Sequence, residues 1–391
     1  MATPSTTPIP STMRAVVQTA PGKASLQTVP VPQIEAGTAL VKILTSLVQS
    51  NLTNIFHAVE PHFRLPYPII PGSFSIGRVA GLAADATVLK EGDLVMVSTL
   101  LNARDDPSVG VVWGVTAGLR EETKKLYSAV ATKGHFAEFV RAPLENVFKL
   151  DEKRLFGAPG AGGLGYKPGD LTILAANAIA YAGLRAIDVK AGERVVITPA
   201  TGHYSTAAVD VAVAMGARVV AASRNAEGLA KIRSTYSSDD SNFGSGATQG
   251  IETVQLTGDI EKDTAAMKSF GPVDAVVEVS PPAATGATNF AAAIASLRTD
   301  GRISLLGGRG DQNIPVPYAQ AMWNNLRIQG SWMYTREDVQ AVIRLTEAGL
   351  LRFGKRAGHV VEGVYGLDQL EEAIDKAVEK HGPGCIVYIQ P

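Results

Sequence analysis

The feature that most constrains the fold is an alternation of apolar, strand-like runs with Ala-rich, helix-like stretches in the second half of the chain, from about Leu171 to Gly330. Strands that alternate with helices form parallel sheets, because a crossover must carry the chain back before the next strand can begin. We predict six such strands, enough for a complete doubly wound sheet. They are Arg194–Thr198, Arg218–Ala222, Thr253–Leu256, Ala275–Val279, Ile303–Leu306 and Arg327–Gly330.

The first part of the chain has a different pattern. From Met13 onward, short β-rich runs are separated by Gly and Pro, which predicts a mostly-β domain. These runs are Arg14–Gln18, Ala39–Leu44, Gly77–Gly81, Asp93–Ser98 and Phe136–Arg141. A sheet that already has six strands leaves no place for the helices and strands predicted after Gly330, so we expect them to fold back onto the mostly-β domain.

The predicted domain organisation is therefore discontinuous. Residues 1–12, rich in Pro, Ser and Thr, form a flexible tail, and 13–150 form the first part of the mostly-β domain. Residues 151–330 form the doubly wound domain, and 331–391 return to the first domain. One polar stretch, 234–250, predicts an inserted surface loop, with an active-site lid as the alternative.

Charge and composition argue against several kinds of partner. Lys and Arg number 36 against 37 Asp and Glu, without a block of like charge, so we expect no nucleic acid and no membrane surface as partner. The longest apolar run, 171–184, is shorter than the ~20 residues of a membrane span and predicts a buried helix. A single cysteine, Cys385, cannot form an intramolecular disulfide, and the first residues resemble neither a secretion signal nor a transit peptide. We expect a cytoplasmic protein.

A dinucleotide site is predicted at the turn after the first strand of the sheet, before a helix over 205–215. Such a turn brings backbone N–H groups and the positive end of a helix to a pyrophosphate, provided that the side chains allow close approach. Ala200, Gly202 and Ser205 occupy the three positions of the glycine fingerprint, and only one is glycine. An ordinary connection without a ligand is the alternative. The candidate cofactor residues of this turn are Ala200, Thr201, Gly202, His203, Tyr204 and Ser205.

The residues after the second strand predict which dinucleotide binds. An NAD site usually has an acidic residue there, which accepts hydrogen bonds from the ribose hydroxyls. This chain has Ser223 and Arg224 instead, and both can donate to the 2′-phosphate of NADPH. We predict NADPH as the cofactor; the alternative is that Arg224 only faces solvent.

Motifs along nearly the whole chain resemble the medium-chain dehydrogenase/reductase superfamily, particularly its quinone reductase and enoyl reductase-like branches. They are residues 13–17, 71–72 with 77, 91–95, 134–140, 189–193, 300–303 and 305–308. The resemblance implies an α/β protein with a GroES-like, mostly-β domain made from both ends of the chain. It also implies a Rossmann domain between them, a substrate cleft where they meet, and a homodimer. It places Leu306, Gly307 and Gly308 among the cofactor residues.

The resemblance also shows where zinc-dependent members carry their ligands, and this chain departs from them. Those positions hold Gln49, Ser73 and Phe74, none of which offers the thiolate, imidazole or carboxylate that zinc prefers. His57, Glu60 and His62 are the rival metal site, but no further ligand is near them in the sequence, and a solvated loop is the better interpretation. We predict no metal.

Without zinc, hydrogen-bond donors must stabilise the negative charge that develops on the substrate. This favours NADPH-dependent reduction of an activated C=C bond in an enone, a quinone or an enoyl thioester, because the charge then spreads onto an attached carbonyl. The alternatives are a zinc-free ketone reductase or alcohol dehydrogenase, and a dinucleotide-binding protein without catalysis.

Two residues are candidate donors to a small-molecule substrate. Asn51 stands where zinc-dependent relatives carry a Ser or Thr, and Tyr181 lies on the apolar helix before the Rossmann domain. The alternative for Asn51 is a turn residue bonded to local backbone. The alternative for Tyr181 is a packed side chain whose hydroxyl meets the cofactor.

Overall fold

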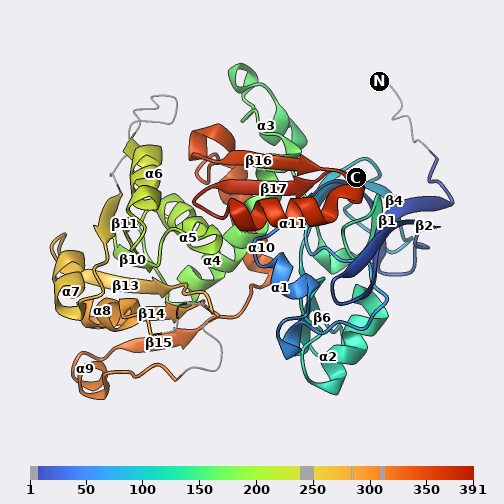
Figure 1. Cartoon of the computed structure of the whole chain (residues 1–391). Coiled ribbons are helices and arrows are strands. Elements are labelled where there is room, and N and C mark those ends of the chain that lie inside the picture. Colours follow the sequence, from blue (N-terminus) through green and yellow to red (C-terminus); the bar gives the residue numbers. More distant parts are fainter. Residues whose placement is uncertain (1–7, 238–250, 283, 285, 309–312) are drawn as a thin grey trace. The chain divides into compact units, whose positions relative to one another are not determined.

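The structure is a computed structural model that describes residues 8–237, 251–282, 284, 286–308 and 313–391 (Figure 1). The chain divides into two compact units. The first unit is Met1–Ala175, Val360–His381 and Cys385–Pro391; the second is Ala176–His359 with Gly382–Gly384.

The second unit is built on six parallel strands in the order β12-β11-β10-β13-β14-β15. Their bounds are β10 (Arg194–Thr198), β11 (Arg218–Ser223), β12 (Glu252–Gln255), β13 (Val273–Glu278), β14 (Leu297–Leu305) and β15 (Arg327–Gly330). The chain runs outward from β10 to one edge of the sheet and then returns to the other side of β10. The predicted doubly wound Rossmann sheet is confirmed, with β14 beginning six residues earlier than the sequence pattern indicates.

Helices precede, connect and follow these strands. They are α4 (Leu174–Ala186), α5 (His203–Ala214), α6 (Ala226–Ser237), α7 (Ile260–Lys268), α8 (Asn289–Ser296), α9 (Tyr318–Trp323) and α10 (Arg336–Glu347). Helix α5 is almost entirely buried and packs on β10 and β11, because its small Ala and Val side chains let it lie close to the sheet. Within the predicted loop 234–250, residues 234–237 are the end of α6, and 238–250 lie outside the described residues.

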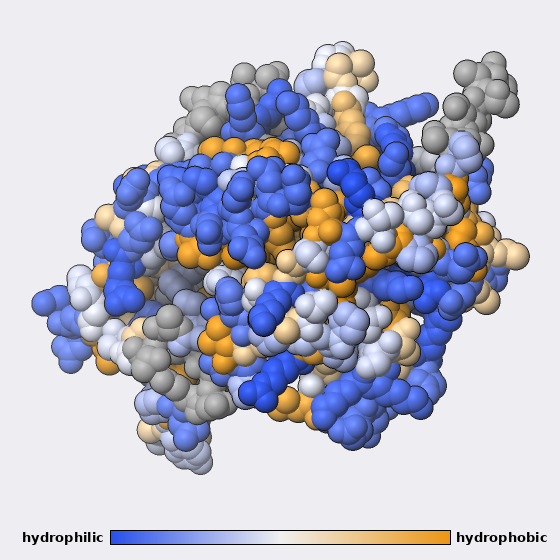
Figure 2. Space-filling view, turned by 45° about the vertical axis from the view of Figure 1, so that its right-hand side comes forward, coloured by the Kyte–Doolittle hydropathy of each residue, from blue (hydrophilic) through white to orange (hydrophobic). Residues whose placement is uncertain are grey.

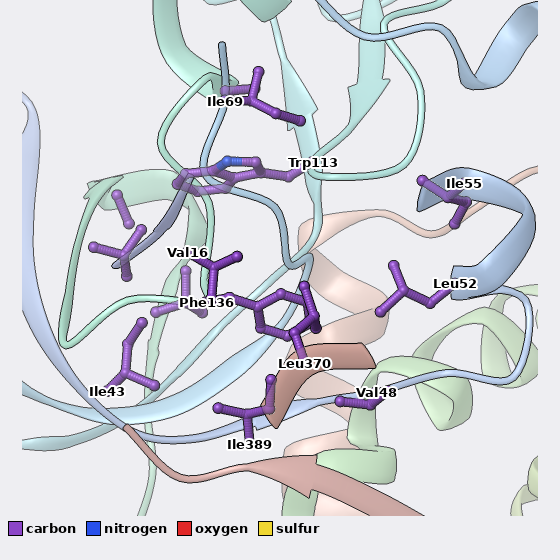
Figure 3. Close-up of a cluster of buried hydrophobic side chains, with 14 of the residues drawn as sticks. Val16, Ile43, Val48, Leu52, Ile55, Ile69, Trp113, Phe136, Leu370 and Ile389 are labelled. Atoms are coloured by element: carbon purple, nitrogen blue, oxygen red, sulfur yellow. The ribbon is translucent and has the colours of Figure 1, made fainter. Parts of the chain in front are cut away.

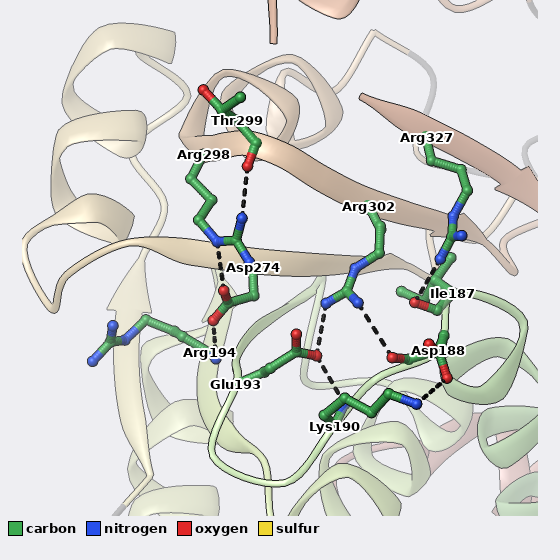
Figure 4. A network of polar contacts seen from close by, with 10 residues as sticks. All are labelled: Ile187, Asp188, Lys190, Glu193, Arg194, Asp274, Arg298, Thr299, Arg302 and Arg327. Carbon is green, nitrogen blue, oxygen red and sulfur yellow. Dashed lines mark hydrogen bonds and ion pairs between the residues drawn. The ribbon is translucent and has the colours of Figure 1, made fainter. Parts of the chain in front are cut away.

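A polar network braces the amino-terminal edge of this sheet (Figure 4). Arg302 of β14 donates to the Glu193 carboxylate at 2.6 Å and to the Asp188 carbonyl at 3.2 Å. Asp274 accepts from the Arg194 backbone N–H at 2.7 Å and from Arg298 at 2.6 Å. These contacts hold the loop between α4 and β10 against the strands. The opposite, carboxyl-terminal edge of the sheet is the one from which the candidate cofactor turn projects.

The first unit is mostly β, as predicted. Its larger sheet has the order β16-β17-β3-β4-β5-β9, with β8 also paired to β3, and two smaller sheets pair β1 with β2 and β6 with β7. The strands are β1 (Thr12–Ala20), β2 (Lys23–Pro30), β3 (Thr38–Leu47), β4 (Ser75–Leu82), β5 (Leu94–Val97), β6 (Leu100–Asn102), β7 (Gly110–Val112), β8 (Phe139–Pro143), β9 (Val147–Lys149), β16 (Val360–Tyr365) and β17 (Cys385–Ile389). The helices of the unit are α1 (Leu52–Phe56), α2 (Glu121–Leu126), α3 (Glu152–Phe156) and α11 (Leu370–Glu379).

One apolar core joins both ends of the chain within the first unit (Figure 3). Val16 from the start and Leu370 and Ile389 from the end pack into the same cluster as Trp113 and Phe136. Strand β17 also pairs antiparallel with β3, which places the last strand of the chain inside this sheet. The unit therefore cannot be completed until the last residues of the chain are present.

Two helices group differently from the predicted domain limits of 151–330 and 331–391. Helix α3 belongs to the first unit, where Arg78 of β4 donates to the Glu152 carboxylate at 2.8 Å. Helix α10 belongs to the second, where Arg185 of α4 donates to Asp338 at 3.0 Å. Both contacts are ion pairs between residues far apart in the sequence. Local strand and helix patterns do not reveal such pairs. Of the predicted tail, Thr12 opens β1, and residues 1–7 lie outside the described residues.

Hydrophilic residues cover much of the face shown in Figure 2, with hydrophobic residues in smaller areas between them. Within the described part of the chain, no helix combines the length and the apolar character needed to cross a membrane. The helix expected over the apolar run 171–184 is α4, which follows a 3-10 turn at Pro168–Ile173.

Two glycines of the first unit provide a test of its packing. Gly114 has φ +67°, and a Cβ added there would lie 2.4 Å from the carbonyl oxygen of Gly72. Gly92 has φ +84°, with nothing within 4 Å of such a Cβ. We expect Gly92→Ala to lower the free energy of unfolding by about 1 kcal/mol through backbone strain alone, and Gly114→Ala by about 2–5 kcal/mol because overpacking is added.

The measurement is the thermal midpoint of each variant beside the wild type. Equal midpoints for the two variants would contradict the close approach of the Gly72 and Gly114 backbones.

Candidate active site

The candidate cofactor turn lies between β10 and α5 and is held by its own hydrogen bonds. Ala200 N–H donates to the carbonyl of Ala222 in β11 at 2.8 Å, which fixes the turn against the neighbouring strand. Gly202 N–H donates to the Ser205 hydroxyl at 2.9 Å. The first bond of the helix runs from Thr206 N–H to the Gly202 carbonyl at 2.8 Å. The N–H groups that begin α5 therefore lie ahead of the helical hydrogen-bond ladder, where an anion binds.

Helix α5 starts two residues earlier than the sequence pattern indicates, at His203. His203 and Tyr204 are thus in its first turn, and Gly202 is its N-cap with an extended backbone (φ −91°, ψ 170°). A Cβ at Gly202 would meet only the Ser205 hydroxyl, at 3.1 Å. This glycine is consequently not required by the protein's own packing and leaves the space in front of the helix free.

The residues after β11 lie beside the same turn. Ser223 is buried, and its hydroxyl lies 2.8 Å from the Thr201 hydroxyl and accepts from Asn225 N–H at 3.2 Å. Arg224, which lies between Ser223 and Asn225 in the sequence, is exposed. Asn225 accepts from Gly228 N–H at 3.0 Å at the start of α6, and a Cβ at Gly228 would lie 2.8 Å from Thr201. Gly228, which lets the start of α6 approach Thr201, was not predicted; its signal in the sequence is a glycine in the first turn of a helix.

The third group of predicted cofactor residues follows β14. Leu306 and Gly307 donate their N–H groups to the Glu278 carbonyl at 2.9 and 3.1 Å. A Cβ at Gly307 would lie 2.5 Å from the Ser280 carbonyl oxygen, whereas a Cβ at Gly308 would meet nothing within 4 Å. Gly307 is therefore required by close packing against the end of β13, and Gly308 faces open space. Glu278, buried at the end of β13, holds this segment through its backbone carbonyl and was not predicted from the sequence.

Burial controls the charge of the side chains that begin α5. Burial, helped by the nearby His359, lowers the pKa of His203 to about 4, so its imidazole is neutral at pH 7. The His203 Nε2 atom is buried and has no hydrogen-bond partner among the described residues. Burial raises the pKa of Tyr204, with Tyr334 contributing, so its phenol is also neutral.

The two predicted catalytic residues lie in different units. Asn51, in the first unit, is the N-cap of α1, but its side chain makes no capping hydrogen bond, and its Oδ1 is buried without a partner in the described chain. The alternative of a side chain satisfied by local backbone therefore does not describe it. Tyr181, in the second unit, is half-buried on α4, one turn before Arg185.

The positions of the zinc ligands contain no metal-binding chemistry. Ser73 and Phe74 are buried immediately before β4, and the backbone carbonyl of Phe74 accepts from the Ser46 hydroxyl at 2.9 Å. Gln49 is half-buried next to Val48, which is buried. Across the described residues, no group of three or more His, Cys, Asp or Glu side chains could hold a metal ion. His57 and His62 are exposed. The residues present do not fit a zinc ion.

One histidine of the first unit is fully buried and contacts Ser75, the residue that follows Phe74. His135 Nδ1 lies 2.8 Å from the Ser75 hydroxyl, and its ring packs edge-on against Trp113. Burial lowers the pKa of His135 to about 3, so this imidazole is neutral. It is a polar core residue, not a charged group.

Two families match this chain. The alcohol dehydrogenase GroES-like domain family matches residues 35–152, and the zinc-binding dehydrogenase family matches residues 205–348. The first match lies within the first unit and the second within the second unit. The chain therefore belongs to the medium-chain dehydrogenase/reductase superfamily and is an NAD(P)-dependent oxidoreductase that acts on small molecules.

Individual relatives are distant in sequence. An alcohol dehydrogenase of Rhizobium meliloti is 29% identical over 86% of this chain and 89% of its own length. An acryloyl-coenzyme A reductase of Metallosphaera sedula is 23% identical over 83% of this chain and 84% of its own. A solved zinc-binding dehydrogenase of Sinorhizobium meliloti, bound to NADP, superimposes with a TM-score of 0.73 at 18% identity, over 98% of this chain and all of that one. The structural likeness establishes the shared fold.

The turn before α5 supplies a test of the cofactor position. We expect Gly202→Val to weaken NADPH binding at least about tenfold, or about 1.4 kcal/mol, because the added side chain occupies the space in front of the helix. The fold should persist, since the backbone at Gly202 suits any residue. The measurement is the Kd for NADPH by fluorescence titration.

The matched control is Gly160→Val, at an exposed site of the first unit where a Cβ meets nothing within 4 Å. Unchanged affinity in a folded Gly202→Val protein would put the cofactor on another turn.

Proposed function

We propose that this protein is an NADPH-dependent, zinc-independent reductase of an activated C=C bond in an enone, a quinone or an enoyl thioester. The observation that carries the proposal is the donor chemistry of the site. The turn between β10 and α5 is polar and hydrogen-bonded, which suits a dinucleotide, while Gln49, Ser73 and Phe74 stand where the superfamily resemblance places zinc ligands. Two acryloyl-coenzyme A reductases among the relatives support this reaction class, because their named substrate is an enoyl thioester.

The residues of the second unit fit a nicotinamide dinucleotide. The beginning of α5 would hold the pyrophosphate, and the open space at Gly308, next to Gly307, would allow the backbone after β14 to approach the cofactor. Ser223 and Arg224 would donate to a 2′-phosphate. When bound, the nicotinamide supplies the hydride for the reaction. The protein supplies position and hydrogen-bond donors.

Asn51 is the proposed donor to the substrate carbonyl. Reduction at the β-carbon places negative charge on the oxygen of the attached carbonyl, and a fixed amide N–H stabilises that charge without a metal. Asn51 suits this role because its side chain is not used for capping α1. Tyr181 is the proposed second polar contact, to the cofactor or substrate from the second unit. A homodimer, implied by the superfamily resemblance, is also part of the proposal.

A second candidate function is zinc-free reduction of a ketone or oxidation of an alcohol. The alcohol dehydrogenases among the relatives favour it, including that of Rhizobium meliloti. A carbonyl reduced directly places a full negative charge on one oxygen, which requires stronger donors than conjugate reduction does. The uncharged residues Gln49, Ser73 and Phe74 provide no such charge, so we prefer conjugate reduction.

The first test is a screen of NADPH oxidation with enones, quinones, enoyl thioesters and simple ketones. We expect turnover with the conjugated substrates, and a fall in kcat of about a hundredfold in Asn51→Ala, the typical loss for one charge-stabilising donor. The matched control is Asn54→Ala, an exposed Asn on the same helix whose hydrogen bonds here are made by its backbone.

Metal analysis accompanies the screen. We expect no stoichiometric zinc and no loss of activity with chelators. One tightly held zinc per chain, or turnover with ketones alone, would overturn the proposal, and intact NADPH binding without any turnover would favour a non-catalytic protein.

The second test concerns cofactor preference. We expect Arg224→Ala to raise the KM for NADPH by the equivalent of about 1.5–3 kcal/mol, the value of a charged hydrogen bond, with little change for NADH. The control is Arg218→Ala, an exposed Arg at the other end of β11. A wild-type preference for NADH, or equal effects on both cofactors, would show that this loop does not select the 2′-phosphate.

A further inference from the structure

Helix α5 carries one acidic residue, and it is buried. Asp210 lies two turns beyond His203 on a helix that is otherwise apolar after its first turn. The hydroxyl of Tyr236, at the end of α6, donates to Asp210 Oδ1 at 2.5 Å. The other carboxylate oxygen, Oδ2, lies 3.6 Å from Nε2 of His359. A buried carboxylate is thus shared between a tyrosine and a histidine.

His359 is held in place by its surroundings. Its side chain is 1% exposed, and its ring packs edge-on against Phe353. The backbone at Gly384 is so close that a Cβ there would lie 3.3 Å from the His359 Cα. His359 is also the residue that immediately precedes β16, where the chain passes back into the first unit.

Four buried nitrogen and oxygen atoms of this group have no hydrogen-bond partner among the described residues. They are Asp210 Oδ2, His203 Nε2 and both ring nitrogens of His359. Buried polar atoms are normally satisfied, and leaving one unsatisfied costs about 1–3 kcal/mol. The same residues could not hold a metal ion. A proton is the species that such a set of one carboxylate and two imidazoles can gain.

His203 lies where a proton would affect the binding of the dinucleotide. His203 is the first residue of α5, directly after the N-cap at which the pyrophosphate is proposed to bind. Without an anion, its imidazole is neutral because burial and His359 lower its pKa. A pyrophosphate brings negative charge to the same helix end, and an opposite charge favours the protonated imidazole.

We propose that His203 takes up one proton when the dinucleotide binds, and that Asp210 and His359 are positioning residues that set the pH at which this occurs. The proposal rests on the proposed cofactor site. Asp210 favours the proton by its negative charge, whereas His359 opposes it as a second imidazole. Only one proton is expected, because two imidazolium ions would share one carboxylate.

The other titratable or charged groups near this cluster keep the same charge when the dinucleotide binds. Tyr236, from α6, keeps its proton at neutral pH because burial and Asp210 raise its pKa. Arg352, from the segment after α10, acts on Tyr236 and keeps a fixed positive charge. Tyr204, whose ring lies edge-on to His203, is neutral. His203 is thus the group whose charge responds to the ligand.

The sign of the pH dependence follows from linkage. The complex binds more protons than the free protein, so affinity increases as pH falls. The effect spans the pH range between the pKa of free His203, about 4, and its higher value in the complex. Within that range the Kd for the dinucleotide should rise by up to about tenfold per pH unit.

The experiment is isothermal titration of NADPH into the full chain at pH 6.5, in buffers of different ionisation enthalpy, which counts the protons exchanged. The 2′-phosphate itself titrates near pH ~6, so the result is the difference between wild type and His203→Gln. We expect this variant to lose about 0.5–1 proton of uptake. His381→Gln, which changes an exposed histidine of the first unit, is the control and should match the wild type.

Two further variants separate electrostatic positioning from a merely structural role. In pH profiles of Kd, Asp210→Asn should move the proton uptake to lower pH, and His359→Gln should move it to higher pH. Loss of packing alone would weaken binding in both variants without opposite shifts. Thermal melting identifies any variant that fails to fold, and His203→Gln, at a half-buried site, provides the result that does not depend on the other two.

Equal proton numbers in wild type and His203→Gln, or shifts of the same sign in Asp210→Asn and His359→Gln, would overturn the inference. If the wild type does not bind NADPH at all, the proposed cofactor site is wrong as well. If it binds NADPH without proton uptake, only the inference fails.

Discussion

The constraint on which the site depends is the parallel pairing of β10 with β11 on one side and with β13 on the other. Because all six strands point the same way, each one ends at the same edge of the sheet. The turn after β10, the Ser223–Arg224 segment after β11 and the backbone after β14 are therefore brought to one edge, although more than a hundred residues separate the first from the last. A sheet with one strand reversed would place these groups at opposite ends.

The two units satisfy their structural requirements in different ways. The second has a compact sheet whose amino-terminal edge is braced by arginine–carboxylate contacts, leaving the other edge for the ligand (Figure 4). The first closes a core of side chains from both ends of the chain, with Val16 and Ile389 in one cluster (Figure 3). The chain leaves the first unit and later returns to it. His359 is the last residue of the second unit before this return at β16. Its contact with Asp210 ties α5 to the segment that leads into β16.

Gln49, Ser73 and Phe74 stand where the superfamily resemblance places zinc ligands. Phe74 is fully buried, and Ser73 is nearly so. The GroES-like sheet around them is maintained by backbone pairing of β3 with β4, which does not depend on those side chains. The sheet can therefore form with uncharged side chains at these positions. In the proposed function, the dinucleotide and donors such as Asn51 supply the chemistry.

The sequence by itself determined the six parallel strands, the mostly-β first domain and the location of the turn at 199–205, because periodicity and turn residues act over short stretches of chain. It also showed that Gln49, Ser73 and Phe74 are poor zinc ligands, since that depends only on side-chain chemistry. Only the tertiary structure decided that α3 belongs with the first unit and α10 with the second, through the pairs Arg78–Glu152 and Arg185–Asp338. The same is true of the contact between Asp210 and His359, which are 149 positions apart by their numbers. A charged residue on an apolar helix signals that a partner is needed, but which residue meets it depends on how distant segments pack, and no local pattern contains that information.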